Sequence, residues 1–121
     1  MEEILSIKNL TKEEFDALVV NIFYYLGYSI DKSGSTKFEY FLENEELQFI
    51  LKVAFKINGE FSTLEDILEF KKEVVNTKSW KGYFISNTDF EKSAYDQLEN
   101  FKDQIRLFNQ SESLRLGLRS I

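Results

Sequence analysis

The chemistry open to this chain is limited first by the reactive side chains that it lacks. Neither histidine nor cysteine occurs among its 121 residues. Ser-His and Cys-His triads, imidazole or thiolate metal sites and disulfides are therefore excluded. Any catalysis must use carboxylates, Lys, Tyr, Ser or Thr, or a metal ion that is held by oxygens. The five glycines are scattered along the sequence and form no phosphate-binding loop.

Lys52 draws attention because of the strand on which it is predicted to lie. Residues 47–56 alternate between two faces. One face carries Leu47, Phe49, Leu51, Val53 and Phe55. The other face carries Gln48, Ile50, Lys52, Ala54 and Lys56. A lysine on the less apolar face of a buried strand either belongs to a polar site or extends its ammonium group to solvent, and the sequence leaves both interpretations open.

Two carboxylates are candidates to accompany this lysine. Glu39 lies in the alternating segment 37–43, where alternation by itself also predicts a surface residue. Asp16 lies near the start of the first expected helix, where an acid also interacts favourably with the helix dipole. The remaining nearby acids fit a solvated hairpin end better than a metal cluster: Glu43, Glu45 and Glu46.

Hydrophobic periodicity predicts the elements that would position these residues. Thr11 and Glu14 form a capping box before an amphipathic helix at about 12–26, which Gly27 ends. The other expected elements are strands at 28–31, 37–43 and 47–56, a helix to about 77, a strand at 80–86, a helix at about 90–101, a strand at 105–108 and a helical turn around 113–118. This α-β-β-β-α-β-α-β order predicts an α/β (α+β) fold, with a mixed sheet of four to five strands flanked by helices.

The two later helices carry less distinct signals. Ser62 and Thr63 can both cap the second helix. Its expected apolar stripe is Leu64, Ile67, Leu68, Lys71, Val74 and Val75. Residues 87–89 are expected to cap the third helix. Its expected inward-facing residues are Ala94, Leu98 and Phe101.

Composition and charge narrow the classes of function. The net charge of −6 and the isoelectric point of about 4.8 argue against strong non-specific DNA affinity. No apolar run is long enough to span a membrane, and the first ten residues do not resemble a signal peptide. We therefore expect a single domain over residues 1–121, located in the cytoplasm by default.

Several short strings occur in an order that is familiar from one family. The first helix contains Phe-Asp-Ala-Leu-Val at 15–19 and ends in Leu-Gly-Tyr at 26–28. A later strand reads Lys-Gly-Tyr-Phe-Ile-Ser at 81–86, and Phe90 and Ala94 follow it. Together with the apolar strand at 105–108 and Leu114, these strings resemble the Mrr-type restriction endonuclease domain, which has the PD-(D/E)xK nuclease fold.

The resemblance implies a catalytic centre with one altered position. Glu39 occupies the place of the family's Asp, and Ile50-Leu51-Lys52 occupies the place of Gln/Glu-x-Lys. Asp16 matches a family position that is commonly acidic. By resemblance, Asp16 and Glu39 would hold Mg²⁺ or Mn²⁺ and Lys52 would act on the attacking water or the phosphate. Ile50 could offer only its backbone carbonyl, and Phe38 stands where the family usually has a glycine.

Two functions remain open on these grounds. The first is a DNA-acting module of the restriction and defence type, whose catalytic centre is degenerate; if active, it would be a Mg²⁺-dependent endodeoxyribonuclease. The acidic chain would then bind DNA weakly alone and would work with a protein partner or as a homo-oligomer. The second is a non-catalytic interaction or assembly module on the same fold, for which Tyr24, Tyr25 and Tyr28 could line a partner surface.

Overall fold

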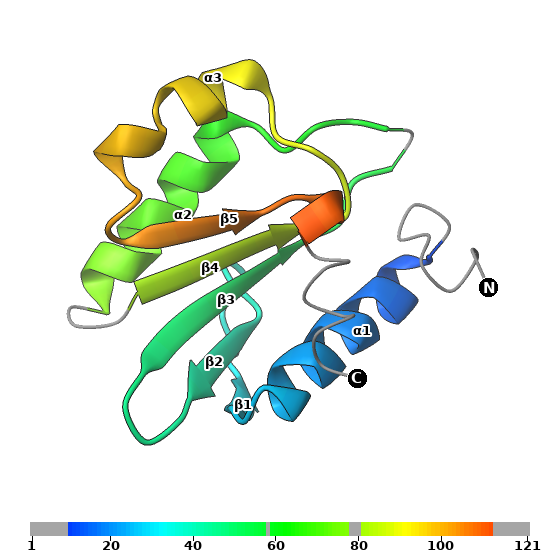
Figure 1. Ribbon diagram of the computed structural model, residues 1–121, viewed down its shortest axis with the longest axis vertical. Helices are drawn as coiled ribbons and strands as arrows, with labels where there is room; N and C mark the ends of the chain where they lie inside the picture. The colour runs from blue at the N-terminus through cyan, green and yellow to red at the C-terminus, as the bar shows by residue number, and fades with distance from the viewer. Residues whose placement is uncertain (1–9, 58, 78–80, 113–121) are drawn as a thin grey trace.

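The computed structural model describes residues 10–57, 59–77 and 81–112 (Figure 1). In chain order the elements are α1 (Lys12–Tyr25), β1 (Ser29–Lys32), β2 (Tyr40–Glu43), β3 (Gln48–Ala54), α2 (Leu64–Asn76), β4 (Lys81–Ser86), α3 (Lys92–Asp96), the 3₁₀ helix η3 (Leu98–Asn100) and β5 (Ile105–Phe108). The predicted order of helices and strands is confirmed. The helical turn expected around 113–118 lies outside the described residues.

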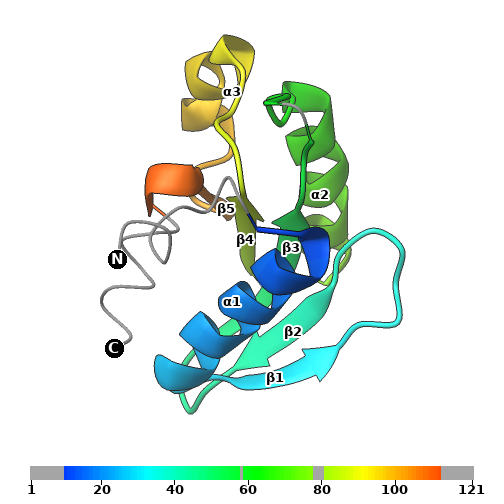
Figure 2. The ribbon, with the colours of Figure 1, turned by 90° about the vertical axis from the view of Figure 1, so that its right-hand side faces the viewer.

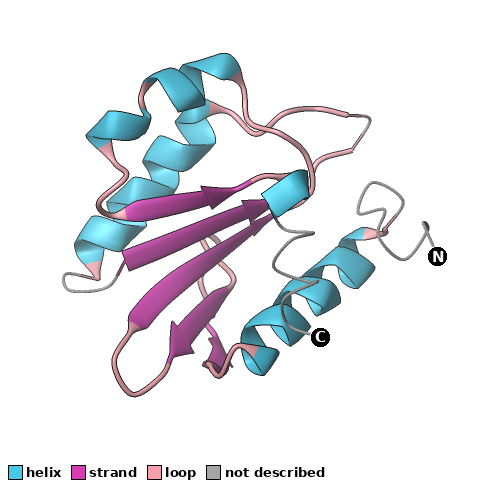
Figure 3. Ribbon diagram, in the orientation of Figure 1, coloured by secondary structure: helices cyan, strands magenta, loops and turns pink. Residues whose placement is uncertain are grey.

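The five strands form one mixed sheet in the order β1-β2-β3-β4-β5 (Figure 3). β1, β2 and β3 pair antiparallel, so they form a meander. β3, β4 and β5 pair parallel, and the intervening α2 and α3 make the crossovers. The mixed sheet of four to five strands that the sequence predicted is therefore present, with β3 at its centre.

Helices cover both faces of the sheet, with α1 on one face and α2 and α3 on the other (Figure 2). The alternation predicted for β3 is confirmed, because Phe49, Leu51 and Val53 pack in the core beside α1. Ile50 and Ala54 pack in the core beside α2. Lys52 lies on this second face, between two fully apolar positions. The core on that side therefore surrounds the base of the lysine side chain.

The predicted N-terminal caps of the helices are only partly confirmed. The capping box of Thr11 and Glu14 is present, and Thr63 forms a second one with Asp66. Residues 87–89 do not cap α3, which begins after Glu91 without a side-chain cap. That expectation was wrong. The side-chain amide of Asn87 forms hydrogen bonds with the backbone of Lys56 instead.

The buried stripe of α2 also differs from the expectation. Ile67, Phe70 and Val74 are buried, whereas Leu68 and Val75 are 42% and 53% exposed. Phe70 was missed because Leu68 and Val75 also recur at helical spacing. Gly82 of β4 decides which residues face the sheet, since a Cβ at that position would lie 2.6 Å from atoms of both Phe70 and Val74. Only a glycine lets α2 approach β4 this closely.

No helix in the described part of the chain is both long enough and apolar enough to cross a membrane.

Candidate active site at Glu39 and Lys52

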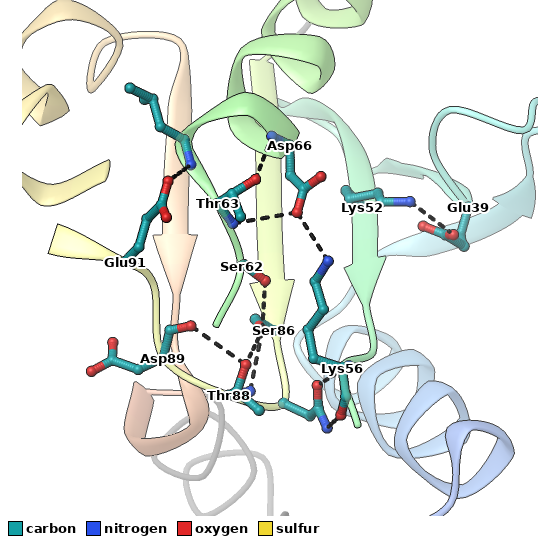
Figure 4. Close-up of polar contacts among 12 residues, drawn as sticks. Glu39, Lys52, Lys56, Ser62, Thr63, Asp66, Ser86, Thr88, Asp89 and Glu91 are labelled. Carbon is teal, nitrogen blue, oxygen red and sulfur yellow. Dashed lines mark hydrogen bonds and ion pairs between the residues drawn. The ribbon is translucent and has the colours of Figure 1, made fainter. Parts of the chain in front are cut away.

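Glu39, in the segment just before β2, and Lys52, on the central strand β3, point toward each other (Figure 4). Their nearest charged atoms, Lys52 Nζ and Glu39 Oε2, lie 3.5 Å apart. The side chains are 26% and 34% exposed, respectively, so the pair is open to solvent on one side and enclosed on the other. The structure thus brings together the two residues that the sequence offered as catalytic candidates.

The backbone around Glu39 explains why its side chain is held there. Residues 37–39 are not part of β2, which is shorter than predicted and begins at Tyr40. The Glu39 amide still donates to the Leu51 carbonyl at 3.0 Å, and its own carbonyl accepts from the Ser33 amide. Glu39 Oε1 accepts a 2.7 Å hydrogen bond from the Val53 amide. One carboxylate oxygen is therefore already used by β3, and the other faces Lys52.

The Ile50 side chain lies in the hydrophobic core and not beside the charged groups of Glu39 and Lys52. Its side chain is 0% exposed and belongs to the cluster on the α2 face. Phe38 is in the same cluster, and Phe41 packs against it. The rings of Phe38 and Phe41 meet edge to face with their centroids 5.3 Å apart. Phe38 and Phe41 therefore contribute aromatic rings to the same core as Ile50.

Asp16 is bound to a tyrosine on the α1 side of the sheet. The Tyr40 hydroxyl donates to Asp16 Oδ2 at 2.6 Å. Burial, this hydrogen bond and the charges of Asp16 and Glu39 together raise the pKa of Tyr40 well above its usual range. Tyr40 therefore remains a neutral hydrogen-bond donor at physiological pH. Sequence reasoning missed this contact, because nothing in the spacing of residues 16 and 40 indicates it.

The side chains present do not fit a complete Mg²⁺ or Mn²⁺ site. Mg²⁺ requires near-octahedral oxygen ligation at short distances. Ile50 offers no side-chain oxygen, and β2 and β4 flank it on both sides, so the sheet's hydrogen-bond ladder competes for its carbonyl. Glu39 and Asp16 each have one oxygen engaged. The described residues contain no group of three or more carboxylates that could hold a metal.

A second ion pair lies further along the same face of β3 (Figure 4). Lys56 Nζ is 3.0 Å from Asp66 Oδ2, and the two side chains are 28% and 35% exposed. Partial burial alone raises the pKa of Asp66, but the hydrogen bonds from Lys56 and Thr63 outweigh it and lower the pKa below its usual value. Alternation had placed Lys56 on the face of Lys52, but nothing in the sequence pattern indicates that Asp66 is its partner.

The family model described as Mrr_cat, restriction endonuclease, matches residues 7–116. This chain belongs to the Mrr_cat family. The match covers all the described elements of the sheet and both cores, so the Mrr_cat domain accounts for the fold described above. The resemblance inferred from the short sequence strings is confirmed.

Solved structures with the same fold include a protein of unknown function, AF1548 (TM-score 0.69, 12% identity, 88% of this chain and 65% of that one). The MspJI restriction endonuclease in complex with a 27-mer oligonucleotide also matches (TM-score 0.57, 11% identity, 86% and 26%). So does the DNA modification-dependent restriction endonuclease AspBHI (TM-score 0.60, 9% identity, 95% and 38%). At these identities the likeness shows the fold alone. This chain spans less than two thirds of each of these proteins, and no curated protein sequence matches it significantly.

Proposed function

We propose that this Mrr_cat chain is a single restriction-endonuclease-like domain that acts on DNA at the Glu39–Lys52 ion pair. In this proposal the catalytic centre is degenerate, so the domain engages the DNA backbone but hydrolyses it poorly or not at all. The observation that carries the proposal is the 3.5 Å pairing of Lys52 with Glu39 beside a fully buried Ile50. The lysine of the family's motif, Lys52, is paired with a carboxylate, whereas Ile50, at the motif's other position, is buried in the core.

The chemistry of the pair supports contact with phosphate. A lysine ammonium has three hydrogen-bond donors and is a common ligand of phosphate oxygens. Packing around the base of Lys52 limits its motion, so less conformational entropy is lost when it binds. In a metal-dependent reaction the ion would stabilise charge on the phosphate. Here Glu39 and Asp16 are the only carboxylates proposed as ligands.

The proposal is tested by DNA binding and cleavage measured on the same samples. We expect the wild-type chain to bind labelled duplex DNA in a fluorescence anisotropy titration, with an affinity that falls steeply with salt. Lys52→Ala is expected to weaken this binding and reduce the salt dependence by about one phosphate contact. With Mg²⁺ or Mn²⁺ present, plasmid DNA is expected to remain largely intact.

A matched control separates a site effect from a change of net charge. Lys92 forms an exposed ion pair with Asp96 on α3, and Lys92→Ala removes the same charge far from β3. Equal effects of Lys52→Ala and Lys92→Ala on binding would contradict a DNA site at Lys52. Efficient cleavage that Lys52→Ala abolishes would show that the centre is active and would remove the degenerate part of the proposal.

One observation favours the alternative of a non-catalytic interaction module. Tyr24 and Tyr25, at the end of α1, are 67% and 68% exposed, and their rings pack edge to face. Exposed tyrosines are frequent in protein interfaces. On this alternative the chain forms a stable complex or homodimer that Lys52→Ala does not affect, which size exclusion with light scattering would detect.

A further inference from the structure

Lys56 is fixed in position although it lies beyond the end of β3. Asn87 donates from Nδ2 to the Lys56 carbonyl at 2.8 Å and accepts from the Lys56 amide at 2.7 Å. Asn87 is 3% exposed, so a buried amide group is used entirely to hold this one backbone unit. Satisfied buried hydrogen bonds of this kind make the local structure rigid, so the backbone at Lys56 is held in place. The side chain that they direct is a lysine on the face of Lys52.

The Lys56 ammonium is restrained but remains accessible. It pairs with Asp66, and both side chains are about one-third exposed. Asp66 in turn is fixed at the start of α2, where its amide donates to Thr63 Oγ1 and its Oδ2 accepts from the Thr63 amide. The carboxylate is ionised at neutral pH, so protonation does not release the lysine. A competing anion must displace it.

The two lysine pairs follow one another along β3 (Figure 4). Each lysine is held by a carboxylate from a different element, Glu39 from the segment before β2 and Asp66 from α2. Four residues separate the two lysines, so their Cα atoms are about 13 Å apart in a fully extended chain. Each ammonium group is held by its own carboxylate, so the two are suited to contact different phosphate oxygens of one DNA backbone.

We propose that Lys56 is a second phosphate-binding residue of this domain, and that Asp66 holds its ammonium group in the free protein until a DNA phosphate replaces the carboxylate. The inference rests on the proposed function, and it adds Lys56 to Lys52 as a second residue that contacts phosphate. Asp66 is then a competitor of DNA. Removing its charge should strengthen binding, whereas removing the charge of Lys56 should weaken it.

The test is an anisotropy titration of labelled duplex DNA at several salt concentrations between about 50 and 200 mM. Lys56→Gln is expected to weaken binding roughly fivefold to tenfold and to lower the slope of log affinity against log salt by about 0.9, which is one phosphate contact. Lys56→Arg keeps the charge and should retain most of the affinity. Asp66→Asn keeps an oxygen for the helix cap and should bind more tightly than wild type.

The exposed Lys92–Asp96 pair supplies matched controls, since its members are 88% and 55% exposed. Lys92→Gln and Asp96→Asn change the net charge by the same amounts, and they should shift affinity much less. Circular dichroism melts of all variants check that each one is folded. Equal effects of Lys56→Gln and Lys92→Gln, or of Asp66→Asn and Asp96→Asn, would overturn the inference.

The same titrations separate this inference from the proposed function. Binding that depends on Lys52 but not on Lys56 overturns the second site alone. Binding that depends on Lys56 but not on Lys52 overturns the proposed centre and supports the phosphate contact. A wild-type chain that binds no duplex even at about 50 mM salt contradicts both.

Discussion

At the scale of single residues, Ile50 is the position where this chain departs from the motif of the family that it resembles. It stands where the family resemblance calls for an oxygen ligand, and its side chain is completely buried on the α2 face. A polar side chain at this position would need a hydrogen-bond partner, and the surrounding rings of Phe38 and Phe41 supply none of the usual kind. Simple restoration of the ligand is therefore expected to cost stability.

We predict that Ile50→Gln lowers the free energy of unfolding by about 2–4 kcal/mol, because it buries an unsatisfied amide and loses apolar contacts. Urea denaturation measures this change. Ile50→Val is the control, and it should cost about 0.5–1.5 kcal/mol. In a ¹⁵N-HSQC titration with Mn²⁺, the glutamine variant should show no new broadening centred on Glu39 and residues 50–52. New broadening there, with stability near wild type, would contradict the prediction.

Tyr40 gives a prediction about alkaline pH. Its pKa is raised in the folded protein, mainly by burial and by its hydrogen bond to Asp16. An unfolded tyrosine loses its proton near pH 10. The stabilising contribution of the neutral phenol is thus complete below about pH 10, and it is lost as the pH rises towards the folded-state pKa.

We therefore expect the free energy of unfolding to fall above about pH 10, and to fall less steeply in Tyr40→Phe. At neutral pH the same substitution should cost about 0.5–1.5 kcal/mol, the typical value of one hydrogen bond. Urea denaturation from about pH 8 to 11 measures both effects. Tyr83 and Tyr95 also have raised pKa values, so the variant keeps part of the slope. Identical slopes would show that Tyr40 titrates normally.

At the scale of elements, the contact between α2 and β4 sets the position of Asp66. The helix lies against the strand at Gly82, where the nearest atoms belong to Phe70 and Val74. The start of α2 then places Asp66 beside Lys56. A change at Gly82 should therefore be felt both in stability and at the second lysine pair.

Gly82→Ala is expected to destabilise the domain by about 1–3 kcal/mol, because the added methyl group overlaps two side chains in a packed core. Thermal and urea denaturation measure the loss. Phe70→Leu in the same chain removes one of the two overlaps, so the double variant should lose less than the sum of the single changes. Strict additivity of the two substitutions would mean that this contact does not limit the approach of α2.

At the scale of elements, the sequence predicted the faces of β3 but not the contacts between distant segments. Alternation in residues 47–56 correctly assigned each side chain of β3 to its face, because a strand buried on both faces has few other ways to pack. The pairing of Glu39 with Lys52 was predicted only as a shared site. Its geometry depends on β2 starting at Tyr40, which no periodicity signals. The Lys56–Asp66 and Asp16–Tyr40 contacts depend on tertiary packing between distant segments.

At the scale of the whole molecule, the net charge and the two local lysines have opposite effects on the approach of an anionic ligand. The chain carries a net charge of −6, yet Lys52 lies on the central strand β3 and Lys56 lies just beyond its end. Under the proposed function, long-range repulsion would slow the approach of DNA, whereas the two ammonium groups would stabilise the contact once it forms. An isolated domain of this kind should therefore bind weakly and depend on other protein surfaces for its affinity.

We predict a dissociation constant for duplex DNA in the non-specific range of roughly 10⁻⁴–10⁻⁶ M at physiological salt. Doubling the salt should weaken binding in wild type more than in Lys52→Ala, because fewer counterions are released by the variant. Anisotropy at two salt concentrations measures this difference. Tyr24→Ala is the contrasting substitution, since it removes an exposed ring and no charge. A larger loss of DNA affinity with Tyr24→Ala than with Lys52→Ala would place the DNA contact at the end of α1 and contradict the proposed site.

The aromatic packing over Ile50 also bears on how such a domain can change over generations. A metal ligand at residue 50 would require a polar side chain there and a smaller one at Phe38 or Phe41. Either substitution alone leaves an unsatisfied amide or an empty space in the core, so both single-step intermediates are less stable than the start. Proteins have only about 5–15 kcal/mol of stability to lose. A metal ligand at residue 50 therefore requires two substitutions together, because each one alone lowers the stability of the domain.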